Sequence, residues 1–390
     1  PHAAIRPFAM TEEEAAKAPA ATKFTAKPVI KTNYKFTMSV SPLDCMGCTL
    51  CVKACPVTAK AEKDGTDKKA IEMVLQETQL DQQAPFDYAV NNVSEKPELI
   101  NATVKGSQFK QPLLEFSGAC GGCGETPYAK LITQLFGDRM YIANATGCSS
   151  IWGNSSPSTP YTVNAKGQGP AWDNSLFEDN AEFGYGMLLA QNAIRTRLKK
   201  EVEELAEKDA SVKDVAQEWL DTFGVGATNG AATEKLVAAL ADKTDDLSKD
   251  LVKNKDFLAK KSQWIFGGDG WAYDIGFGGL DHVLASGKDI NVMVFDTEVY
   301  SNTGGQSSKS TPTGAVAQFA AGGKETGKKD LPGIAMSYGY VYVAHINMGG
   351  DMQQTVKAIA EAEAYPGPSL IIAYAPCINH GIKKGMAKAM

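Results

Sequence analysis

The sequence predicts an α/β fold with a doubly wound parallel sheet, preceded by a small cysteine-rich region. From about residue 118 onward, short apolar runs typical of strands alternate with helical patterns, and Gly-rich or polar turns follow several of these runs. Before that point, four cysteines lie within residues 45–55. We therefore expect a cysteine-rich domain with an exposed linker in residues 1–60, a connecting segment in 61–117 and the α/β domain in 118–390.

Five runs are expected to form strands of the sheet, because each is short, mainly apolar and rich in β-branched or aromatic residues. They are residues 140–145, 263–266, 290–295, 340–346 and 369–375. Residues 351–365 have the pattern of a helix that ends before Pro366. In residues 185–262, Leu, Val and Ala recur at helical spacing among Lys and Glu, which predicts a helical insertion in the α/β domain.

Composition and charge narrow the class of protein. The chain is 43% hydrophobic and 22% charged, as in globular proteins, and its net charge of −6 gives no electrostatic basis for binding nucleic acid. No stretch reaches the ~18 uncharged apolar residues of a membrane span, and the start lacks the pattern of a secretory signal. We expect a cytoplasmic protein. Because the chain begins with Pro1 and stops without a clear terminal element, we expect a fragment; trimmed ends are the alternative.

The cysteine run has the spacing Cys45-x2-Cys48-x2-Cys51-x3-Cys55, followed by proline, which is the spacing of bacterial ferredoxins. It predicts a [4Fe–4S] cluster; a zinc site or chance spacing is the alternative. In that pattern three cysteines bind one cluster and the fourth binds the other cluster of a pair. Because only one such run is present, we expect further cluster cysteines immediately before Pro1.

Two polar segments follow neighbouring predicted strands: Gly268-Asp269-Gly270 and, 25 residues after Gly270, Asp296-Thr297. Oxygen atoms are the ligands that Mg²⁺ needs when it binds a diphosphate, and glycines let the backbone approach phosphates. We expect Asp269, the Thr297 side chain and the Val299 carbonyl to bind the metal, with Asn302 reaching the phosphates. The pair resembles the motif of thiamine-diphosphate enzymes, although that motif usually ends in two asparagines. An ordinary Gly-Asp-Gly turn is the alternative.

The remaining cysteines are Cys120, Cys123, Cys148 and Cys377. Cys148 and Cys377 follow predicted strands, and ligands bind at the carboxyl ends of strands in open α/β sheets. A second [4Fe–4S] cluster beside the diphosphate would use all four; a redox pair, a zinc knuckle and plain buried thiols are the alternatives.

Glu125 is either a thiamine contact or a glutamate favoured at a helix N-terminus. Structural or surface positions are expected for the four histidines, which are His2, His282, His345 and His380.

The motifs CMGCTLCVKACP, SGACGGCGETPYAKL, ANATGCSSIWG, GGDGWAYDIGFGGLDH, DTEVYSNTGGQSSKSTPTGA and APCINHG occur in this order. Together they resemble the pyruvate:ferredoxin (flavodoxin) oxidoreductases, over nearly the whole chain. The resemblance implies part of a ferredoxin-like α+β domain followed by a thiamine-diphosphate-binding domain. It implies that Cys120, Cys123, Cys148 and Cys377 bind the cluster nearest thiamine. The implied cofactor contacts are Glu125, Cys148, Gly268, Asp269, Gly270, Trp271, Thr297, Glu298, Val299, Tyr300, Ser301 and Asn302.

The implied reaction is oxidative decarboxylation of pyruvate with coenzyme A to acetyl-CoA and CO₂, in a homodimer that passes electrons through [4Fe–4S] clusters to ferredoxin or flavodoxin. Asn302 is the one candidate for a catalytic role here, because the family's activating glutamate and substrate-binding arginine lie in N-terminal domains that this sequence lacks. This chain alone should therefore be inactive. The alternatives are an oxidoreductase for another 2-oxo acid or with a fused NADP-linked reductase, a pure iron–sulfur electron-transfer module, and a zinc-binding assembly protein.

Overall fold

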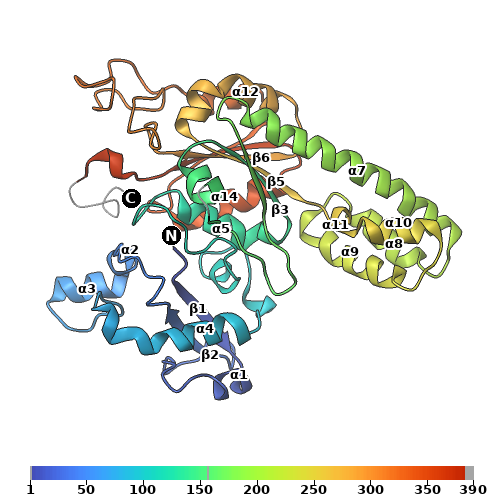
Figure 1. The fold of residues 1–390 in the computed structure, drawn as a ribbon, viewed down its shortest axis with the longest axis horizontal. Helices are drawn as coiled ribbons and strands as arrows, with labels where there is room; N and C mark the ends of the chain where they lie inside the picture. The colour runs from blue at the N-terminus through green and yellow to red at the C-terminus, as the bar shows by residue number, and fades with distance from the viewer. Residues whose placement is uncertain (1, 156–157, 383–390) are drawn as a thin grey trace.

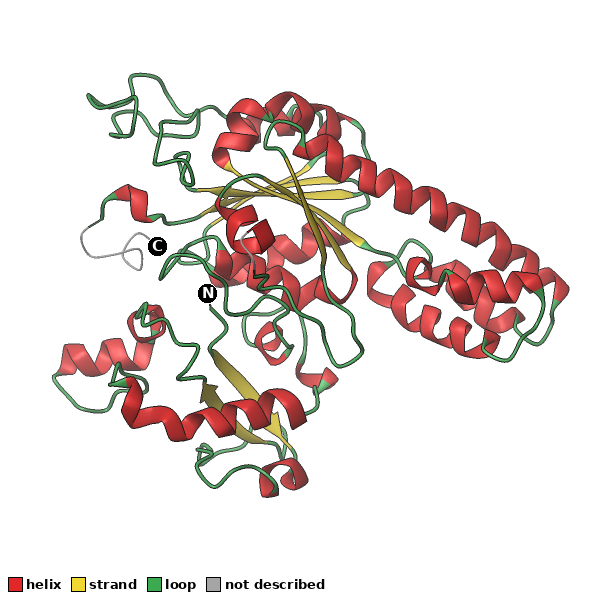
Figure 2. Ribbon diagram, in the orientation of Figure 1, coloured by secondary structure: helices red, strands yellow, loops and turns green. Residues whose placement is uncertain are grey.

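The computed structural model describes residues 2–155 and 158–382. A parallel sheet with helices on both faces forms the centre, an N-terminal region lies below it, and a helical unit projects to one side (Figure 1). Colouring by secondary structure shows the strands crossing the centre between layers of helix (Figure 2). The predicted α/β class is confirmed.

Within the described residues, the central sheet has six strands, and all neighbouring strands are parallel. In spatial order they are β4 (Ala171–Ser175), β3 (Met140–Ala145), β5 (Ser262–Gly268), β6 (Ile290–Asp296), β8 (Pro368–Tyr374) and β7 (Tyr342–Ile346). Five of them occur where strands were predicted. The edge strand β4 was not predicted, because its sequence AWDNS is polar and largely unburied.

Helices cover both faces of the sheet. On one face lie α5 (Thr126–Phe136) and α14 (Met352–Ala364), and on the other lie the start of α7 (Asn180–Lys208), α12 (Phe277–Ala285) and α13 (Leu331–Met336). Side chains along β5 alternate between the two layers, as the two-residue repeat of a strand requires: Trp264 and Phe266 pack with the first group, and Ile265 packs with the second. The sheet is thus buried on both faces, which explains its nearly continuous apolar sequences.

The order of the strands creates a crevice at one edge of the sheet. In the chain, β3 is followed by β4 on one side of it, whereas β5 lies on its other side and begins the second half of the sheet. The loops that leave the carboxyl ends of β3 and β5 therefore diverge, and ligands bind at such a topological switch point. Short helices occupy these and other strand connections: η4 (Gly137–Arg139), α6 (Cys148–Ser150), η5 (Ile151–Ser155), η6 (Gly270–Ile275) and η7 (Ile378–His380).

The N-terminal region is built on the antiparallel pair β1 (Ile5–Met10) and β2 (Lys35–Val40), with α4 (Gln83–Asn92) packed on β2. Its other elements are α1 (Glu12–Ala16), α2 (Leu50–Ala54), α3 (Pro56–Asp64), η1 (Gln76–Gln82), η2 (Pro97–Leu99) and η3 (Gly106–Phe109). The buried guanidinium of Arg6 pairs with Glu115 and lies 5.2 Å and 5.5 Å from the ring centroids of Phe86 and Phe116. These contacts join β1 to α4 and to the segment that enters the α/β domain.

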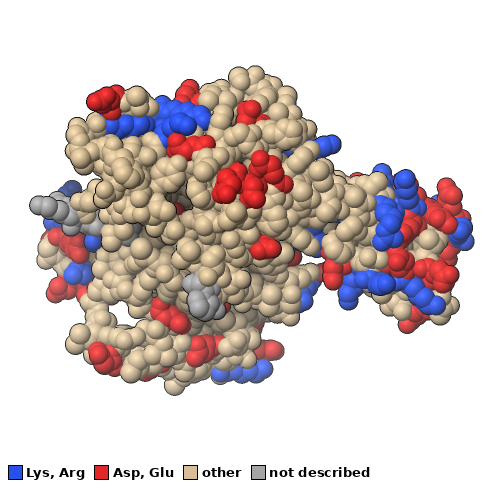
Figure 3. Space-filling model, turned by 45° about the horizontal axis from the view of Figure 1, so that its top comes forward, with Lys and Arg blue, Asp and Glu red and all other residues tan. Residues whose placement is uncertain are grey.

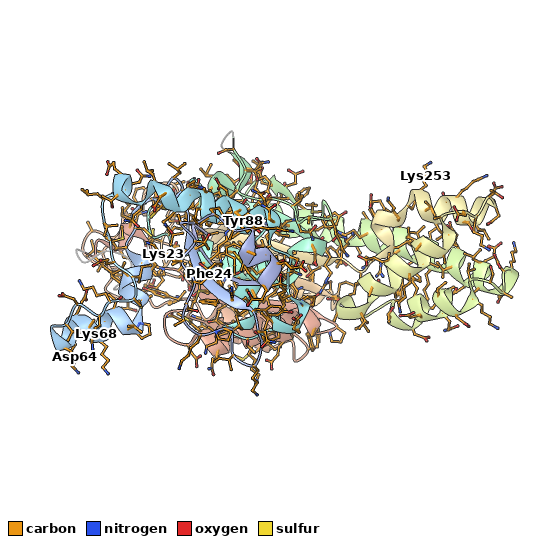
Figure 4. The ribbon with its side chains drawn as sticks, turned by 90° about the horizontal axis from the view of Figure 1, so that it is seen from below. Lys23, Phe24, Asp64, Lys68, Tyr88 and Lys253 are labelled. Carbon is orange, nitrogen blue, oxygen red and sulfur yellow. The ribbon has the colours of Figure 1, made fainter. Side chains whose placement is uncertain are left out.

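The projecting helical unit consists of the second half of α7 together with α8 (Lys213–Thr222), α9 (Gly226–Leu240), α10 (Asp246–Lys253) and α11 (Lys255–Leu258). It has a core of its own around Trp219 and Leu236. Arg195 closes its base by donating to the carbonyls of Phe223 and Leu258. Viewed from below, Lys253 of this unit lies at the opposite end of the molecule from Asp64 (Figure 4).

The surface of the projecting unit carries Lys, Arg, Asp and Glu side chains of both signs close together (Figure 3). Several are paired one turn apart along α7, such as Lys208 with Glu204 and Lys199 with Glu203. Among the described residues, no helix combines the length and the apolar character that crossing a bilayer requires.

Candidate functional site

Four of the predicted residues meet at the carboxyl edge of the sheet. Cys148 follows β3, Asp269 follows β5, Thr297 follows β6 and Cys377 follows β8. Cys148 and Asp269 line the same pocket, and the charge of Asp269 acts on the thiol of Cys377. The structure therefore brings both thiols and both oxygen-bearing side chains together, as the strand-end argument predicts.

Three oxygen atoms converge at the bottom of this pocket. The Thr297 hydroxyl lies 2.9 Å from Asp269 Oδ1 and 3.0 Å from the Val299 carbonyl oxygen. Glu298 between them has φ 60°, a left-handed conformation that turns the chain so that the Val299 carbonyl faces back toward Thr297. A carboxylate, a hydroxyl and a carbonyl are the oxygen ligands that a divalent cation such as Mg²⁺ takes. These residues fit a metal-bound diphosphate.

Asp269 is poised to receive a positive charge. Its carboxyl is fully buried, and burial together with the nearby charge of Asp296 raises its pKa to about 8, although donors from Ser308 and Thr297 oppose the shift. Asp296 is adjacent in sequence to Thr297 but is already compensated, because Lys328 Nζ lies 2.6 Å from its Oδ2 and the Ser310 hydroxyl donates to its Oδ1. Asp269 is therefore the carboxylate that a cation would neutralise.

Most of the predicted cofactor contacts line one pocket. Those that do so are Glu125, Cys148, Gly268, Asp269, Gly270, Trp271, Val299, Tyr300, Ser301 and Asn302. Thr297 is buried just beneath them, and Glu298 turns toward Lys328. The pocket also includes residues that the sequence analysis did not single out, namely Thr146, Gly147, Ser149, Phe177 and Thr303.

The absence of a side chain at Gly270 leaves room for the ring of Tyr300 to pack against the backbone. A Cβ atom at this position would lie 2.4 Å from the ring of Tyr300, so any side chain would displace that wall of the pocket. At Gly268, by contrast, the nearest atom to an added Cβ is the Phe295 carbonyl oxygen at 3.9 Å, which leaves the backbone accessible. The two glycines of the motif thus have different physical roles.

Glu125 lies at the start of α5 and is buried, not exposed as an ordinary helix N-terminal glutamate would be. Burial raises the pKa of its carboxyl to about 7, and a hydrogen bond of 2.8 Å from Trp152 Nε1 opposes this shift. A carboxyl of this kind, in a cofactor-sized pocket, exists in both protonation states near neutral pH.

Replacing Trp152 by phenylalanine is expected to raise the Glu125 pKa above about 7, because the indole donor that stabilises the carboxylate is lost. The change is checked by infrared titration of the buried carboxyl band, with Trp172→Phe as the control, since Trp172 Nε1 donates to Asn144 instead. An unchanged pKa in Trp152→Phe would contradict the role assigned to this hydrogen bond.

Cys120 and Cys123 lie on a loop that is fastened to the segment of Cys377. The Gly124 N–H donates to the Pro376 carbonyl at 3.1 Å, and a Cβ at Gly124 would collide with Pro376. If ionised, Cys148, Cys377 and Cys120 would repel one another, as would Cys123 and Cys148, so these thiols lie near enough to affect one another's pKa. The four thiols thus lie in one region, and Cys148 among them lines the pocket.

Burial raises the pKa of Cys123 and Cys377, and raises that of Cys148 to about 12. Buried thiolates of this kind require a cationic partner such as cluster iron. All eight cysteines are free thiols. Across residues 2–155 and 158–382, no three Cys, His, Asp or Glu side chains are already arranged around a point where a metal ion would be enclosed.

The other cysteine group lies next to the first. Cys45 and Cys48 precede α2, Cys51 lies in it, and Cys55 caps the start of α3. A Cβ built on Gly121, in the loop between Cys120 and Cys123, would lie 3.8 Å from the Cβ of Cys48. The ferredoxin-type run therefore reaches the loop that borders the pocket.

Sequence reasoning missed the residues that support the metal-ligand motif from elsewhere in the chain. Ser308 and Ser310 donate to Asp269 and Asp296, and Lys328 pairs with Asp296. The only signal for the two serines is their position in the polar stretch directly after the motif. His380, expected to be structural or on the surface, is half-buried with its Nε2 2.6 Å from the Thr297 carbonyl oxygen.

Comparison with known proteins points to the same chemistry. Residues 223–373 match the family model "Thiamine pyrophosphate enzyme, C-terminal TPP binding domain". The pyruvate-flavodoxin oxidoreductase of Enterobacter agglomerans is 58% identical over 99% of this chain and 33% of its own length. The pyruvate:ferredoxin oxidoreductase of Moorella thermoacetica is 56% identical over 98% of this chain and 33% of its own length. The mitochondrial pyruvate dehydrogenase [NADP(+)] of Euglena gracilis is 50% identical over 100% of this chain and 21% of its own length.

The chain therefore spans about a third of the length of the first two relatives. The match to the thiamine pyrophosphate model includes β5, β6 and most of β8, the strands that deliver Asp269, Thr297 and Cys377. In sequence, the chain is thus similar to about a third of the length of pyruvate:flavodoxin and pyruvate:ferredoxin oxidoreductases, and it contains a match to the thiamine pyrophosphate-binding domain.

Proposed function

We propose that this chain is the thiamine-diphosphate and iron–sulfur part of an enzyme that oxidises pyruvate with coenzyme A to acetyl-CoA and CO₂. The observation that carries the proposal is the meeting of two ligand sets in one pocket. Asp269, Val299 and Cys148 line it, and the buried Thr297 hydroxyl lies 2.9 Å from Asp269 Oδ1 and 3.0 Å from the Val299 carbonyl oxygen. A diphosphate cofactor and a thiolate-bound cluster would then be neighbours.

In this proposal, the residues of this chain bind the metal and the cofactor and orient them. Asp269, Thr297 and the Val299 carbonyl would hold Mg²⁺, and the accessible backbone at Gly268 would face the diphosphate. Bound thiamine diphosphate supplies the electron sink for decarboxylation. Glu125, with its pKa near 7, would hold or release a proton at its carboxyl where the pocket contacts the cofactor.

Electrons would leave through the two cysteine groups in turn. Cys120, Cys123, Cys148 and Cys377 would hold the cluster next to the pocket. Cys45, Cys48, Cys51 and Cys55 would serve the ferredoxin-type clusters, which also need cysteines from outside this chain. The closeness of Gly121 to Cys48, where an added Cβ would lie 3.8 Å from the Cys48 Cβ, supports a short path from the first group to the second.

The remaining domains of a longer polypeptide are the nearest partners in this proposal, and they would supply the groups that act on pyruvate. Two exposed apolar side chains support the presence of such a partner domain. Phe319 is 93% exposed and Val316 is 74% exposed, and a neighbouring domain would bury this apolar surface. The further partners would be coenzyme A, a ferredoxin or flavodoxin, and a second copy of the chain in a cytoplasmic homodimer. In this proposal, residues 1–60 belong to an iron–sulfur domain with an exposed linker, residues 61–117 form a connecting segment, and residues 118–390 form the thiamine-diphosphate-binding domain.

The test is anaerobic purification of the full-length protein followed by iron, sulfide, magnesium and thiamine analysis and a pyruvate-dependent reduction assay. We expect thiamine diphosphate and Mg²⁺ in equal amounts, iron and sulfide, and reduction of ferredoxin or flavodoxin that requires both pyruvate and coenzyme A. Iron without thiamine would favour an electron-transfer module. Zinc in place of iron would favour an assembly protein, and activity with a different 2-oxo acid would change the substrate.

A further inference from the structure

The turn η7, which follows β8 and Cys377, contacts both halves of the candidate site. His380 Nε2 lies 2.6 Å from the Thr297 carbonyl oxygen. The neighbouring Asn379 donates from Nδ2 to the Ser301 carbonyl at 3.0 Å. The same short turn therefore links the segment of a cluster cysteine to two positions of the metal and diphosphate motif.

The hydrogen-bond partners of His380 define which ring nitrogen carries the proton. The backbone N–H of Cys377 donates to Nδ1 at 3.4 Å, so Nδ1 is the acceptor. Nε2 then carries the hydrogen and donates to the Thr297 carbonyl. The ring also stacks on Tyr374, with the ring planes 19° apart and the centroids 6.2 Å apart. One neutral tautomer satisfies both partners while β8 holds the ring in place.

Each partner of His380 belongs to a residue that also carries a candidate ligand atom. The Thr297 residue whose carbonyl accepts from Nε2 also presents its hydroxyl 2.9 Å from Asp269. The Cys377 residue whose N–H donates to Nδ1 presents its thiol, which accepts from the Asn379 N–H at 3.5 Å. Hydrogen bonds to a ligating sulfur tune the potential of an iron–sulfur cluster. A shift of η7 would change that bond.

We propose that His380 is a positioning residue that couples the metal and diphosphate motif at Thr297 to the cluster thiolate of Cys377. Filling the thiamine site then changes the reduction potential of the neighbouring cluster through the imidazole and η7. This inference rests on the proposed function. Beyond the closeness of the two sites, it states that binding at one site affects the other. It also gives a role to a histidine that has no metal-ligand spacing in the sequence.

The test uses the full-length protein with His380→Phe, which keeps a ring to stack on Tyr374 but removes both hydrogen bonds. His380→Gln is the partial rescue, because its amide can still donate to the Thr297 carbonyl. His345→Phe is the matched control, since His345 is exposed on β7. The midpoint potential of the cluster beside thiamine is measured by EPR-monitored titration, with and without thiamine diphosphate and Mg²⁺. Cofactor affinity is measured by equilibrium dialysis.

We expect the unsubstituted protein and His345→Phe to show a difference in midpoint potential between the loaded and the thiamine-free states. In His380→Phe this difference should fall by at least half, and the affinity for thiamine diphosphate should weaken about three- to tenfold, the loss expected for one hydrogen bond. His380→Gln should show an intermediate difference, because it keeps a donor to the Thr297 carbonyl. A change confined to thermal stability would indicate a merely structural histidine and would overturn the inference.

Two further outcomes would also overturn the inference. One is an unsubstituted protein whose cluster has the same midpoint potential with and without thiamine diphosphate. The other is a His380→Phe variant in which the difference in midpoint potential is as large as in the unsubstituted protein. If His380→Phe does not fold or bind iron, Asn379→Ala, which removes the contact with Ser301, takes its place under the same criteria. A full-length protein without thiamine or iron would contradict the proposed function. A protein that contains both but lacks the coupling would contradict this inference alone.

Discussion

Replacement of Asp269 by asparagine is expected to lower the affinity of the full-length protein for thiamine diphosphate and Mg²⁺ by roughly 100-fold or more. Loss of supporting residues around a metal already costs about 10- to 100-fold, and here a proposed ligand and its charge are removed. The change in shape is minimal, but Thr297 and Ser308 donate to different oxygens of Asp269, so the single amide oxygen can keep only one of these two acceptor positions. The measurement is equilibrium dialysis, with Asp214→Asn on the exposed surface of α8 as the control.

The same variant should change how stability depends on pH. In the thiamine-free protein the Asp269 pKa is about 8, whereas an unfolded aspartate has a pKa of about 3.9. Between these values the folded state binds the extra proton, so the stabilisation is full below about pH 4 and is lost as the pH rises through about 8. We expect the thermal unfolding temperature to fall from pH 5 to 8, and Asp269→Asn to reduce the fall.

Mg²⁺ with thiamine diphosphate should also reduce this fall, because the cation replaces the proton as the partner of the carboxylate. A thiamine-free protein whose unfolding temperature is flat over this range would contradict the assignment of a raised pKa to Asp269. If Asp269→Asn bound the cofactor as tightly as the unsubstituted protein, the assignment of Asp269 as a metal ligand would be wrong.

Replacement of Cys148 by serine is expected to remove the proposed cluster beside the pocket, with a loss of about four iron atoms per protomer. A serine hydroxyl is a poor substitute for a soft thiolate ligand of iron. Because Cys148 also lines the cofactor pocket and lies 3.2 Å from the Ser301 hydroxyl, pyruvate-dependent reduction of ferredoxin should fall to background. Iron analysis and EPR spectra of the reduced protein measure the result.

Cys51→Ser is the matched comparison for Cys148→Ser. Cys51 lies in α2, outside the pocket, so its replacement should remove a different EPR signal and leave thiamine affinity unchanged. Loss of the same signal in both variants would contradict the division of the cysteines into two groups. An iron content equal to that of the unsubstituted protein in Cys148→Ser would exclude Cys148 as a cluster ligand.

The sequence predicted most of the sheet because its inner strands are buried on both faces. β5 and β6 have to be apolar at nearly every position, and this makes them visible. β4 escaped prediction because it is an edge strand whose pairing with β3 depends on backbone hydrogen bonds, while its side chains remain partly exposed. Burial, more than intrinsic preference, determined which strands could be recognised.

The candidate site was predictable where it follows the ends of strands. Asp269 and Thr297 could be brought together by a general rule for parallel sheets, without coordinates. The partners that neutralise Asp296 and orient Glu125 could not, because Lys328 and Trp152 reach them only through the folding of loops. Loop conformations depend on contacts between segments distant in sequence, and no local pattern encodes those contacts.

The helical unit that leaves the sheet along α7 has a consequence for evolution. Two peptide segments connect it to the sheet, α7 itself and residues 259–261 before β5, and its apolar side chains pack mainly with one another. Lineages can lengthen, shorten or exchange this appendage without disturbing the strand pairing of β3 with β5. Sequence divergence among descendants should therefore accumulate in the appendage, while the crevice at the switch point keeps its chemistry.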